Sequence, residues 1–185
     1  MRRYRYENKP LMKPVVALSG RSNVGKSSLL NSLLGTRAAA VSQSPGCTRA
    51  IWLYEPHDEG FLWADLPGYG YATVSQSQRH LWRRETLAFI RQVRPLVCVL
   101  IDSRLPPQEL DKAWVQVLQA EGIPYILVAN KVDKLNQSQR YHQQEVLSQA
   151  FDGAVWRIFV SARTQAGIPS LKAWIKNYFA SQQEL

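Results

Sequence analysis

The chain has 185 residues, 45% of them hydrophobic and 20% charged, and its formal net charge at pH 7 is +9. This length and composition are typical of one soluble globular domain with one sizeable core. No apolar run approaches the roughly 20 residues that cross a bilayer, and the basic start, MRRYRYENKP, leads into an apolar stretch too short for a secretory signal, so we expect neither membrane insertion nor export.

Short apolar runs alternate with longer helical patterns along the chain. The predicted strands are 15–19, 50–54, 61–65, 96–102, 125–130 and 155–160, and the predicted helices are 27–34, 78–93, 107–121, 138–151 and 169–179. This alternation predicts an α/β fold of three layers, with helices on both faces of a mostly parallel sheet. We expect six strands, with one antiparallel strand at an edge, because 50–54 and 61–65 flank a polar turn like a hairpin. We expect residues 1–185 to form one domain, with 1–13 as a basic extension.

A phosphate-binding motif follows the first predicted strand and opens the first predicted helix, the context that this motif requires. Its GxxxxGK[ST] pattern is spelled by Gly20, Arg21, Ser22, Asn23, Val24, Gly25, Lys26 and Ser27. Glycines let the backbone point its N–H groups at phosphate oxygens. The Lys26 ammonium can reach the terminal phosphates, and the Ser27 hydroxyl can bind Mg²⁺. A glycine-rich turn with a chance lysine is a poor alternative in this context.

A DxPG motif, which we expect to lie near the bound Mg²⁺, ends the predicted strand 61–65. It consists of Asp65, Leu66, Pro67 and Gly68. We expect the Asp65 carboxylate to hold Mg²⁺ through a water, because Mg²⁺ releases its waters reluctantly. The Gly68 N–H can meet a γ-phosphate, since no side chain blocks its approach. Alone, the motif would be a simple turn; beside the phosphate loop it predicts a nucleotide site.

A polar segment between the first helix and the hairpin contains Gly46, Cys47 and Thr48. We expect Thr48 to bind Mg²⁺ only when a γ-phosphate is present, so that the segment is ordered with a triphosphate and loose with a diphosphate. Thr36, Ser42 and Ser44 compete for this role. The predicted metal ligands are thus Ser27, Thr48 and Asp65, and the predicted catalytic groups are Lys26, Thr48 and Gly68.

A base-reading motif, NKxD, ends the predicted strand 125–130 and consists of Asn130, Lys131, Val132 and Asp133. The Asp133 carboxylate accepts two hydrogen bonds, and guanine offers two adjacent donors where adenine has an acceptor. That mismatch should cost several kcal/mol. Asn130 would tie the motif to the phosphate loop, and the Lys131 stem would cover one face of the base. Backbone groups of the segment Val160, Ser161 and Ala162, continuing into Arg163, could meet the guanine carbonyl.

These motifs resemble those of the EngB (YihA/YsxC) family of bacterial ribosome-biogenesis GTPases, within the translation-factor-related P-loop GTPases. The similar strings are GRSNVGKSSLLN, PGCTR, DLPGYGYA and IDSRLPPQELD, and the similarity spans nearly the whole chain. The resemblance implies a cytoplasmic GTPase that binds GTP and GDP with Mg²⁺, acts on the large ribosomal subunit during assembly, and is needed for normal cell division and septation. The chain departs from the family at Asn130, usually threonine, and at Arg49, usually glutamine.

Two features bear on hydrolysis. Many GTPases place a water-orienting glutamine directly after DxxG, and this chain has Tyr69 there, so we expect slow intrinsic turnover that a partner raises. Asn23 matches an asparagine that helps related GTPases bind K⁺. An asparagine that only caps loop backbone groups is an equal alternative.

The positive charge favours a polyanionic partner, although a basic surface kept for solubility explains it equally well. We expect ribosomal RNA to contact arginines of the second helix and of the start of the chain: Arg79, Arg83, Arg84, Arg91, Arg94, Arg2, Arg3 and Arg5. Tyr69, Tyr71 and Trp82 could stack on bases, but for Trp82 we favour core packing. Trp114, Trp156 and Trp174 are expected in the core as well.

Cys47 and Cys98 lack the spacing of a metal site and are predicted to be apolar fillers in a reducing cytoplasm. We expect a monomer. Two alternatives to ribosome assembly stay open: a GTPase of tRNA modification or signalling, and a GTP/GDP-sensing module with negligible turnover.

Overall fold

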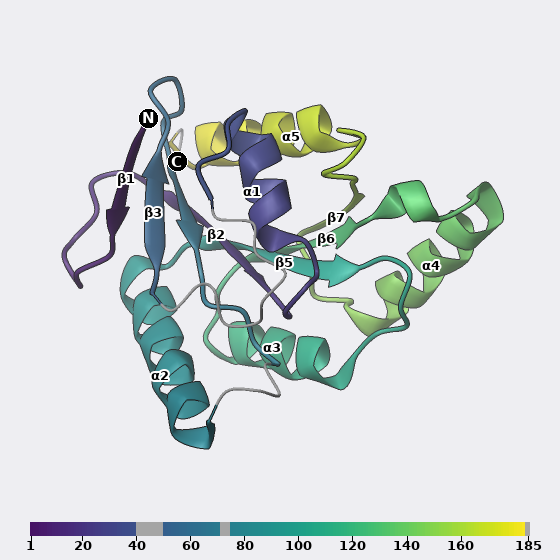
Figure 1. Cartoon of the computed structure of the whole chain (residues 1–185), viewed down its shortest axis with the longest axis horizontal. Helices are drawn as coiled ribbons and strands as arrows, with labels where there is room; N and C mark the ends of the chain where they lie inside the picture. Colours follow the sequence, from purple (N-terminus) through teal and green to yellow (C-terminus); the bar gives the residue numbers. More distant parts are fainter. Residues whose placement is uncertain (40–49, 71–74, 184–185) are drawn as a thin grey trace.

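Strands and helices alternate along the chain as the hydrophobic pattern predicts (Figure 1). The computed structural model describes residues 1–39, 50–70 and 75–183, without the side chains of residues 78, 79, 82 and 183. The strands are β1 Arg2–Arg5, β2 Val15–Gly20, β3 Trp52–Glu55, β4 Leu62–Asp65, β5 Leu96–Asp102, β6 Tyr125–Asn130 and β7 Trp156–Phe159. The helices are α1 Lys26–Leu34, α2 Gln76–Val93, α3 Glu109–Ala120, α4 Gln137–Ala150 and α5 Ile168–Gln183, with a short 3-10 helix, η1, at Val132–Lys134.

The described strands form one sheet in the order β1-β3-β4-β2-β5-β6-β7. The expected number of six strands is corrected to seven, because the N-terminal extension pairs with β3 as an edge strand, from Arg2 opposite Glu55 to Arg5 opposite Trp52. The antiparallel strand β3 therefore lies one place inside the edge. The Arg3 guanidinium stacks 4.1 Å from the ring centroid of Trp52, a cross-strand contact that the strand's charge alone does not predict.

Alternate residues of the parallel strands face two separate cores. In β2, Val15 and Ala17 belong to one core, whereas Val16 and Leu18 belong to the other. Helices α2, α3 and α4 cover the first face and α1 and α5 cover the second (Figure 1). The three-layer α/β class is thereby confirmed. The neighbouring strands β4, β2, β5 and β6 are parallel, so their C-terminal ends lie on the same side of the sheet.

Most element boundaries lie within one or two residues of the predicted ones. The largest difference is at α5, which continues to Gln183 instead of ending at residue 179, whereas α3 begins at Glu109, after the two prolines. Cys98 is fully buried in the core, as predicted, whereas Cys47 lies outside the described residues. Within the described part of the chain, no helix is long and apolar enough to cross a membrane.

Candidate functional site

The phosphate-binding motif forms the turn between β2 and α1. Gly25 precedes the helix with a φ of +95°, and Asn23 has a φ of +64°, so the turn uses the left-handed region twice. A Cβ on Gly25 would lie only 2.5 Å from Nδ2 of Asn130. Only glycine therefore permits both the turn and its close approach to the base-reading motif.

The DxPG motif is bonded directly to this turn. The backbone N–H of Tyr69 donates to the carbonyl of Gly20 (3.2 Å), and the N–H of Ser22 donates to the carbonyl of Tyr69 (3.1 Å). The Lys26 ammonium forms an ion pair with Asp65, and both side chains are buried. The structure thus joins the proposed phosphate lysine and the proposed metal carboxylate in one place.

The described residues of the expected metal site fit Mg²⁺. Mg²⁺ is usually bound by one or two protein groups, the substrate phosphates and several waters, and Asp65 with Ser27 meets that pattern without a dedicated cage. The described residues contain no group of three or more histidine, cysteine or acidic side chains that could hold a metal alone. The other expected residues, Gly46, Cys47 and Thr48, lie outside the described residues.

Asn130 connects the base-reading motif to two other segments. Its Nδ2 donates to the carbonyl of Val24 in the phosphate loop (3.0 Å), and its Oδ1 accepts from the N–H of Ala162 (3.3 Å). Asn130 is only 2% exposed, so these bonds form away from water. The expectation that Asn130 ties the base side to the phosphate side agrees with this geometry.

Lys131 lies directly against the phosphate loop. Its backbone has a φ of +70°, and its Nζ donates to the carbonyl of Asn23 (2.8 Å) and to Oδ2 of Asp102 (2.9 Å). The Asn23 side chain makes no hydrogen bond within the described part of the chain. Asp102 belongs to the string IDSRLPPQELD, which carries part of the family resemblance. The sequence did not predict its contact with Lys131.

The Asp133 carboxylate is held by the side chain of Ser161, a residue expected to offer only its backbone N–H to the base. The Ser161 hydroxyl donates to Oδ1 of Asp133 (2.7 Å), and this bond lowers the pKa of the carboxyl, so that Asp133 is ionised at neutral pH. The N–H of Ser161 donates to Ala166 and that of Ala162 to Asn130. Of the expected backbone donors to the base, only the N–H of Arg163 has no partner in the described residues.

Comparison with known proteins identifies this arrangement. The family model described as "50S ribosome-binding GTPase" matches residues 15–131. A probable GTP-binding protein EngB of Acidobacterium capsulatum is 40% identical over 184 residues, which are 95% of this chain and 86% of that protein. The chain belongs to the EngB family of GTPases. A second probable EngB, from Thermotoga maritima, is 40% identical over 166 residues, 88% of this chain and 85% of that protein.

Solved structures agree with membership of the EngB family. A crystal structure of a probable GTP-binding protein engB matches with a TM-score of 0.74 and 25% identity, over 87% of this chain and 96% of that one. Era in complex with MgGDPNP and nucleotides 1506–1542 of 16S ribosomal RNA matches with a TM-score of 0.77 and 25% identity, over 89% of this chain and 56% of that one. The predicted P-loop GTPase fold is confirmed.

Tyr69, the residue after DxPG, is held by α3 in this EngB-family chain. Its hydroxyl donates to Asp111 (2.9 Å), whose other oxygen accepts from Arg21 of the phosphate loop (3.3 Å). Its ring lies 6.0 Å from that of Trp114, which in turn donates to the Ser19 hydroxyl. Burial, and then the charge of Asp111, raises the pKa of Tyr69 well above its ordinary value, so the phenol stays protonated as a donor.

Tyr69→Phe is expected to lower the free energy of unfolding by about 1–3 kcal/mol, because it takes one of two hydrogen-bond donors from the buried Asp111 carboxylate. Intrinsic GTP turnover should stay unchanged, since the phenol oxygen bonds to α3. Urea unfolding and phosphate release measure the two effects. Tyr141→Phe, at a phenol that is 67% exposed, is the matched control. A large loss of turnover in Tyr69→Phe would contradict this interpretation and give the phenol a catalytic role.

Proposed function

We propose that this GTPase is a nucleotide-dependent switch that acts in assembly of the large ribosomal subunit. It would bind GTP and GDP with Mg²⁺, hydrolyse GTP slowly by itself, and hydrolyse it faster on a ribosomal particle. The single observation that carries the proposal is the direct bonding of three motifs: the phosphate loop bonds to DxPG through Tyr69 and to the base-reading motif through Asn130 and Lys131. One ligand with a phosphate chain and a guanine base suits such a site.

Each motif then has a distinct role. Lys26 would stabilise charge on the terminal phosphates, with the Gly68 N–H and Thr48 completing the γ-phosphate side. Ser27, Asp65 and Thr48 would hold Mg²⁺, which neutralises phosphate charge when bound. Asp133 would select guanine. The chain's own contribution is to bind, orient and stabilise charge, since phosphoryl transfer needs little covalent chemistry from the protein.

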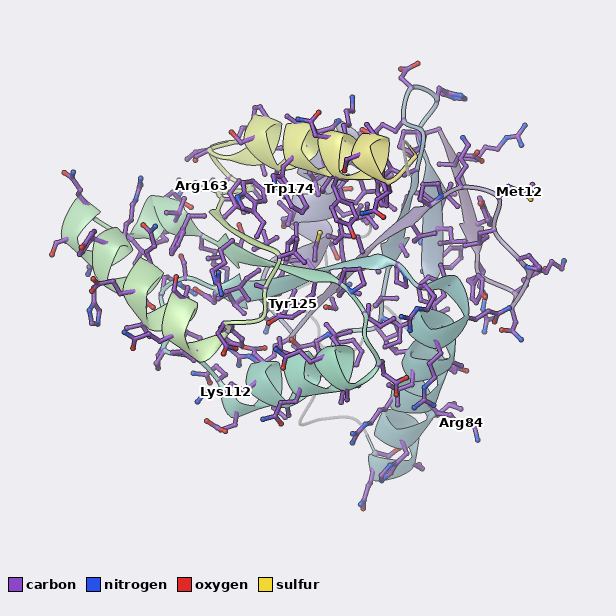
Figure 2. All side chains as sticks on the ribbon, turned by 180° about the vertical axis from the view of Figure 1, so that it is seen from behind. Met12, Arg84, Lys112, Tyr125, Arg163 and Trp174 are labelled. Atoms are coloured by element: carbon purple, nitrogen blue, oxygen red, sulfur yellow. The ribbon has the colours of Figure 1, made fainter. Side chains whose placement is uncertain are left out.

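A basic surface at one end of the sheet supports an RNA partner. The Arg2 side chain on β1 is exposed, and so is Arg84 on α2, which lies at the same end of the molecule as Met12 (Figure 2). Arg5 is exposed too, but it shares the face of Arg3 and lies on the other side of the sheet from α2. Tyr6 packs edge-on against Phe89 of α2 at 4.8 Å, which fixes the N-terminal strand relative to that helix. Both elements can therefore meet one stretch of phosphate backbone.

Two arginines that the sequence placed with this group have other partners. Arg91 makes two hydrogen bonds to the Glu121 carboxylate, and Arg94 donates to the carbonyls of Glu121 and Gly122. These bonds join the end of α2 to the end of α3. The side chains of Arg79 and Trp82 are outside the described set, and so is the whole of Tyr71, so we base the RNA proposal on Arg2 and Arg84.

Sedimentation with large ribosomal subunits tests the proposal directly. Binding should differ between GDP and a non-hydrolysable GTP analogue, should weaken as salt rises, and should accompany faster phosphate release. Equal binding in both nucleotide states would remove the switch. Binding without any turnover would favour the GTP/GDP-sensing module, and no binding would favour tRNA modification or signalling.

The double variant Arg2→Glu and Arg84→Glu is expected to bind these particles roughly tenfold more weakly at moderate salt, because charge reversal removes phosphate contacts and adds repulsion. Its nucleotide affinity should be unchanged. The control is the double variant Arg5→Glu and Lys176→Glu, which changes net charge by the same amount at exposed residues on the other face of the sheet from α2. Equal losses in the two double variants would indicate net charge alone and reject this surface.

We also propose that Asn23 helps K⁺ to support hydrolysis. The exposed side-chain amide of Asn23 has no partner among the described residues, so its carbonyl oxygen is available to a cation. GTP turnover should then be faster in KCl than in NaCl at equal ionic strength, and Asn23→Ala should remove the difference. Equal rates in both salts for the parent protein would reject the K⁺ role.

The family resemblance also suggests where the protein acts and which cell process needs it. We propose a monomeric protein of the cytoplasm, with residues 1–185 as one GTP-binding domain, and a requirement for normal cell division and septation that follows from ribosome supply. Depletion in cells tests this: precursors of the large subunit should accumulate before septation fails. The opposite order would separate the division defect from ribosome assembly.

A further inference from the structure

A buried carboxylate lies between the phosphate loop and the base-reading motif. Asp102 is the last residue of β5, and its side chain is 5% exposed. Oδ1 accepts from the backbone N–H and Nε of Arg104 at 3.1 and 2.8 Å. Oδ2 accepts from the Arg104 guanidinium at 2.6 Å and from Nζ of Lys131 at 2.9 Å. One carboxylate thus bonds two cations, of which only Lys131 belongs to the base-reading motif.

Asp102 also holds its charge. Burial raises the pKa of the Asp102 carboxyl, but the hydrogen bonds from Arg104 and Lys131 outweigh burial and hold this pKa well below its usual range. Asp102 is therefore an anion at neutral pH. A buried anion with two cationic donors makes strong, short hydrogen bonds and fixes the groups that it touches.

Lys131 is the residue whose position depends on this anion. A lysine ammonium has three donors on a flexible four-carbon stem, and here two of them bond to Asp102 and to the carbonyl of Asn23. The Cε atom of Lys131 lies 3.9 Å from where a Cβ on Gly25 would be, so the stem passes over the phosphate loop. Without Asp102, one neutral carbonyl would remain to hold the ammonium.

We propose that Asp102 is a positioning residue for guanine-nucleotide binding: together with Arg104 it fixes Lys131, so that the lysine stem is already placed to cover the base when the nucleotide arrives. This inference rests on the proposed function, which assigns Lys131 to the base. Because GDP and GTP share the base, both should lose affinity equally when Asp102 is changed. Turnover of bound GTP should not change, because the contact is remote from the γ-phosphate.

A double-mutant cycle tests the inference. Asp102→Asn is expected to weaken binding of fluorescent GDP and of a non-hydrolysable fluorescent GTP analogue by about tenfold each, the size of one charged hydrogen bond, with kcat unchanged. In a Lys131→Met background, the same change should cause no further loss, because Asp102 acts through the lysine. Glu121→Gln, which removes a carboxylate bonded to Arg91 away from the site, is the control and should leave both affinities unchanged.

The outcomes separate the inference from the proposed function. If Lys131→Met leaves both affinities unchanged, the assignment of Lys131 to the base is wrong. If Lys131→Met weakens binding but Asp102→Asn does not, or weakens it equally in both backgrounds, only the positioning role is overturned. If Asp102→Asn does not fold, the cycle is run with Asp102→Glu. Its displaced carboxylate should weaken nucleotide binding in the parent protein and should have no further effect in the Lys131→Met background.

Discussion

Asp133→Asn is expected to weaken GTP and GDP binding by roughly 100-fold or more, because a carboxylate that accepts two hydrogen bonds from guanine becomes an amide with one acceptor and one donor. The same amide should favour xanthine, which has a carbonyl oxygen where guanine has its exocyclic amine. The Ser161 hydroxyl that bonds to Oδ1 of Asp133 at 2.7 Å can bond equally to the asparagine oxygen, so the side chain should keep its place. The variant should therefore exchange one base preference for another.

Competition between GDP and xanthosine diphosphate for a fluorescent nucleotide measures this exchange. The control is Asp152→Asn, at an exposed carboxylate after α4, which should leave the preference unchanged. An Asp133→Asn protein that kept its guanine preference would show that another group reads the base. An Asp133→Asn protein that bound neither nucleotide, while unfolding in urea like the parent, would still place Asp133 in the nucleotide site. It would reject the proposed pair of hydrogen bonds to the base.

The fold was predictable from the sequence where local pattern decides it. Strands β5 and β6 were predicted to the residue, because each is a continuous apolar run that follows a proline and ends at a polar residue, and parallel strands buried on both faces need that composition. Strand β1 was not predicted, since its exposed RRYR sequence forms a strand only by pairing with β3, about 50 residues away along the chain. Cross-strand pairing is a tertiary property, and charge alone indicated only an extension.

The candidate site shows the same division. Motif spacing places Asp65 and Asn130 at the ends of β4 and β6, and Gly25 and Lys26 at the start of α1, because these positions depend on backbone turns that the sequence encodes locally. The contacts among side chains of different motifs were not predictable: the bonds of Asp111 to Tyr69 and of Asp102 to Lys131 join residues 42 and 29 positions apart. Their only sequence signal is an acidic residue near the end of a strand or the start of a helix.

The second large effect is expected at the buried ion pair of Lys26 and Asp65. Lys26→Met should lower kcat/KM for GTP by at least about 100-fold, because it removes the cation that stabilises charge on the transferring phosphate. It should also lower the stability of the nucleotide-free protein by about 3 kcal/mol, since it removes the buried cation that pairs with the Asp65 carboxylate. Activity and stability should thus fall together in the single variant.

The double variant Lys26→Met and Asp65→Asn separates the two effects. Removing both charges should restore most of the stability in urea unfolding, because an uncharged pair has little desolvation cost, while phosphate release stays at the level of the single variant. Arg91→Met, which breaks an exposed ion pair with Glu121, is the matched control and should change neither quantity much. If the double variant recovered GTP turnover along with stability, Lys26 would serve the fold and not the phosphates. If Lys26→Met were as stable as the parent, the pair would contribute no net stability, and the activity loss alone would then define the role of Lys26.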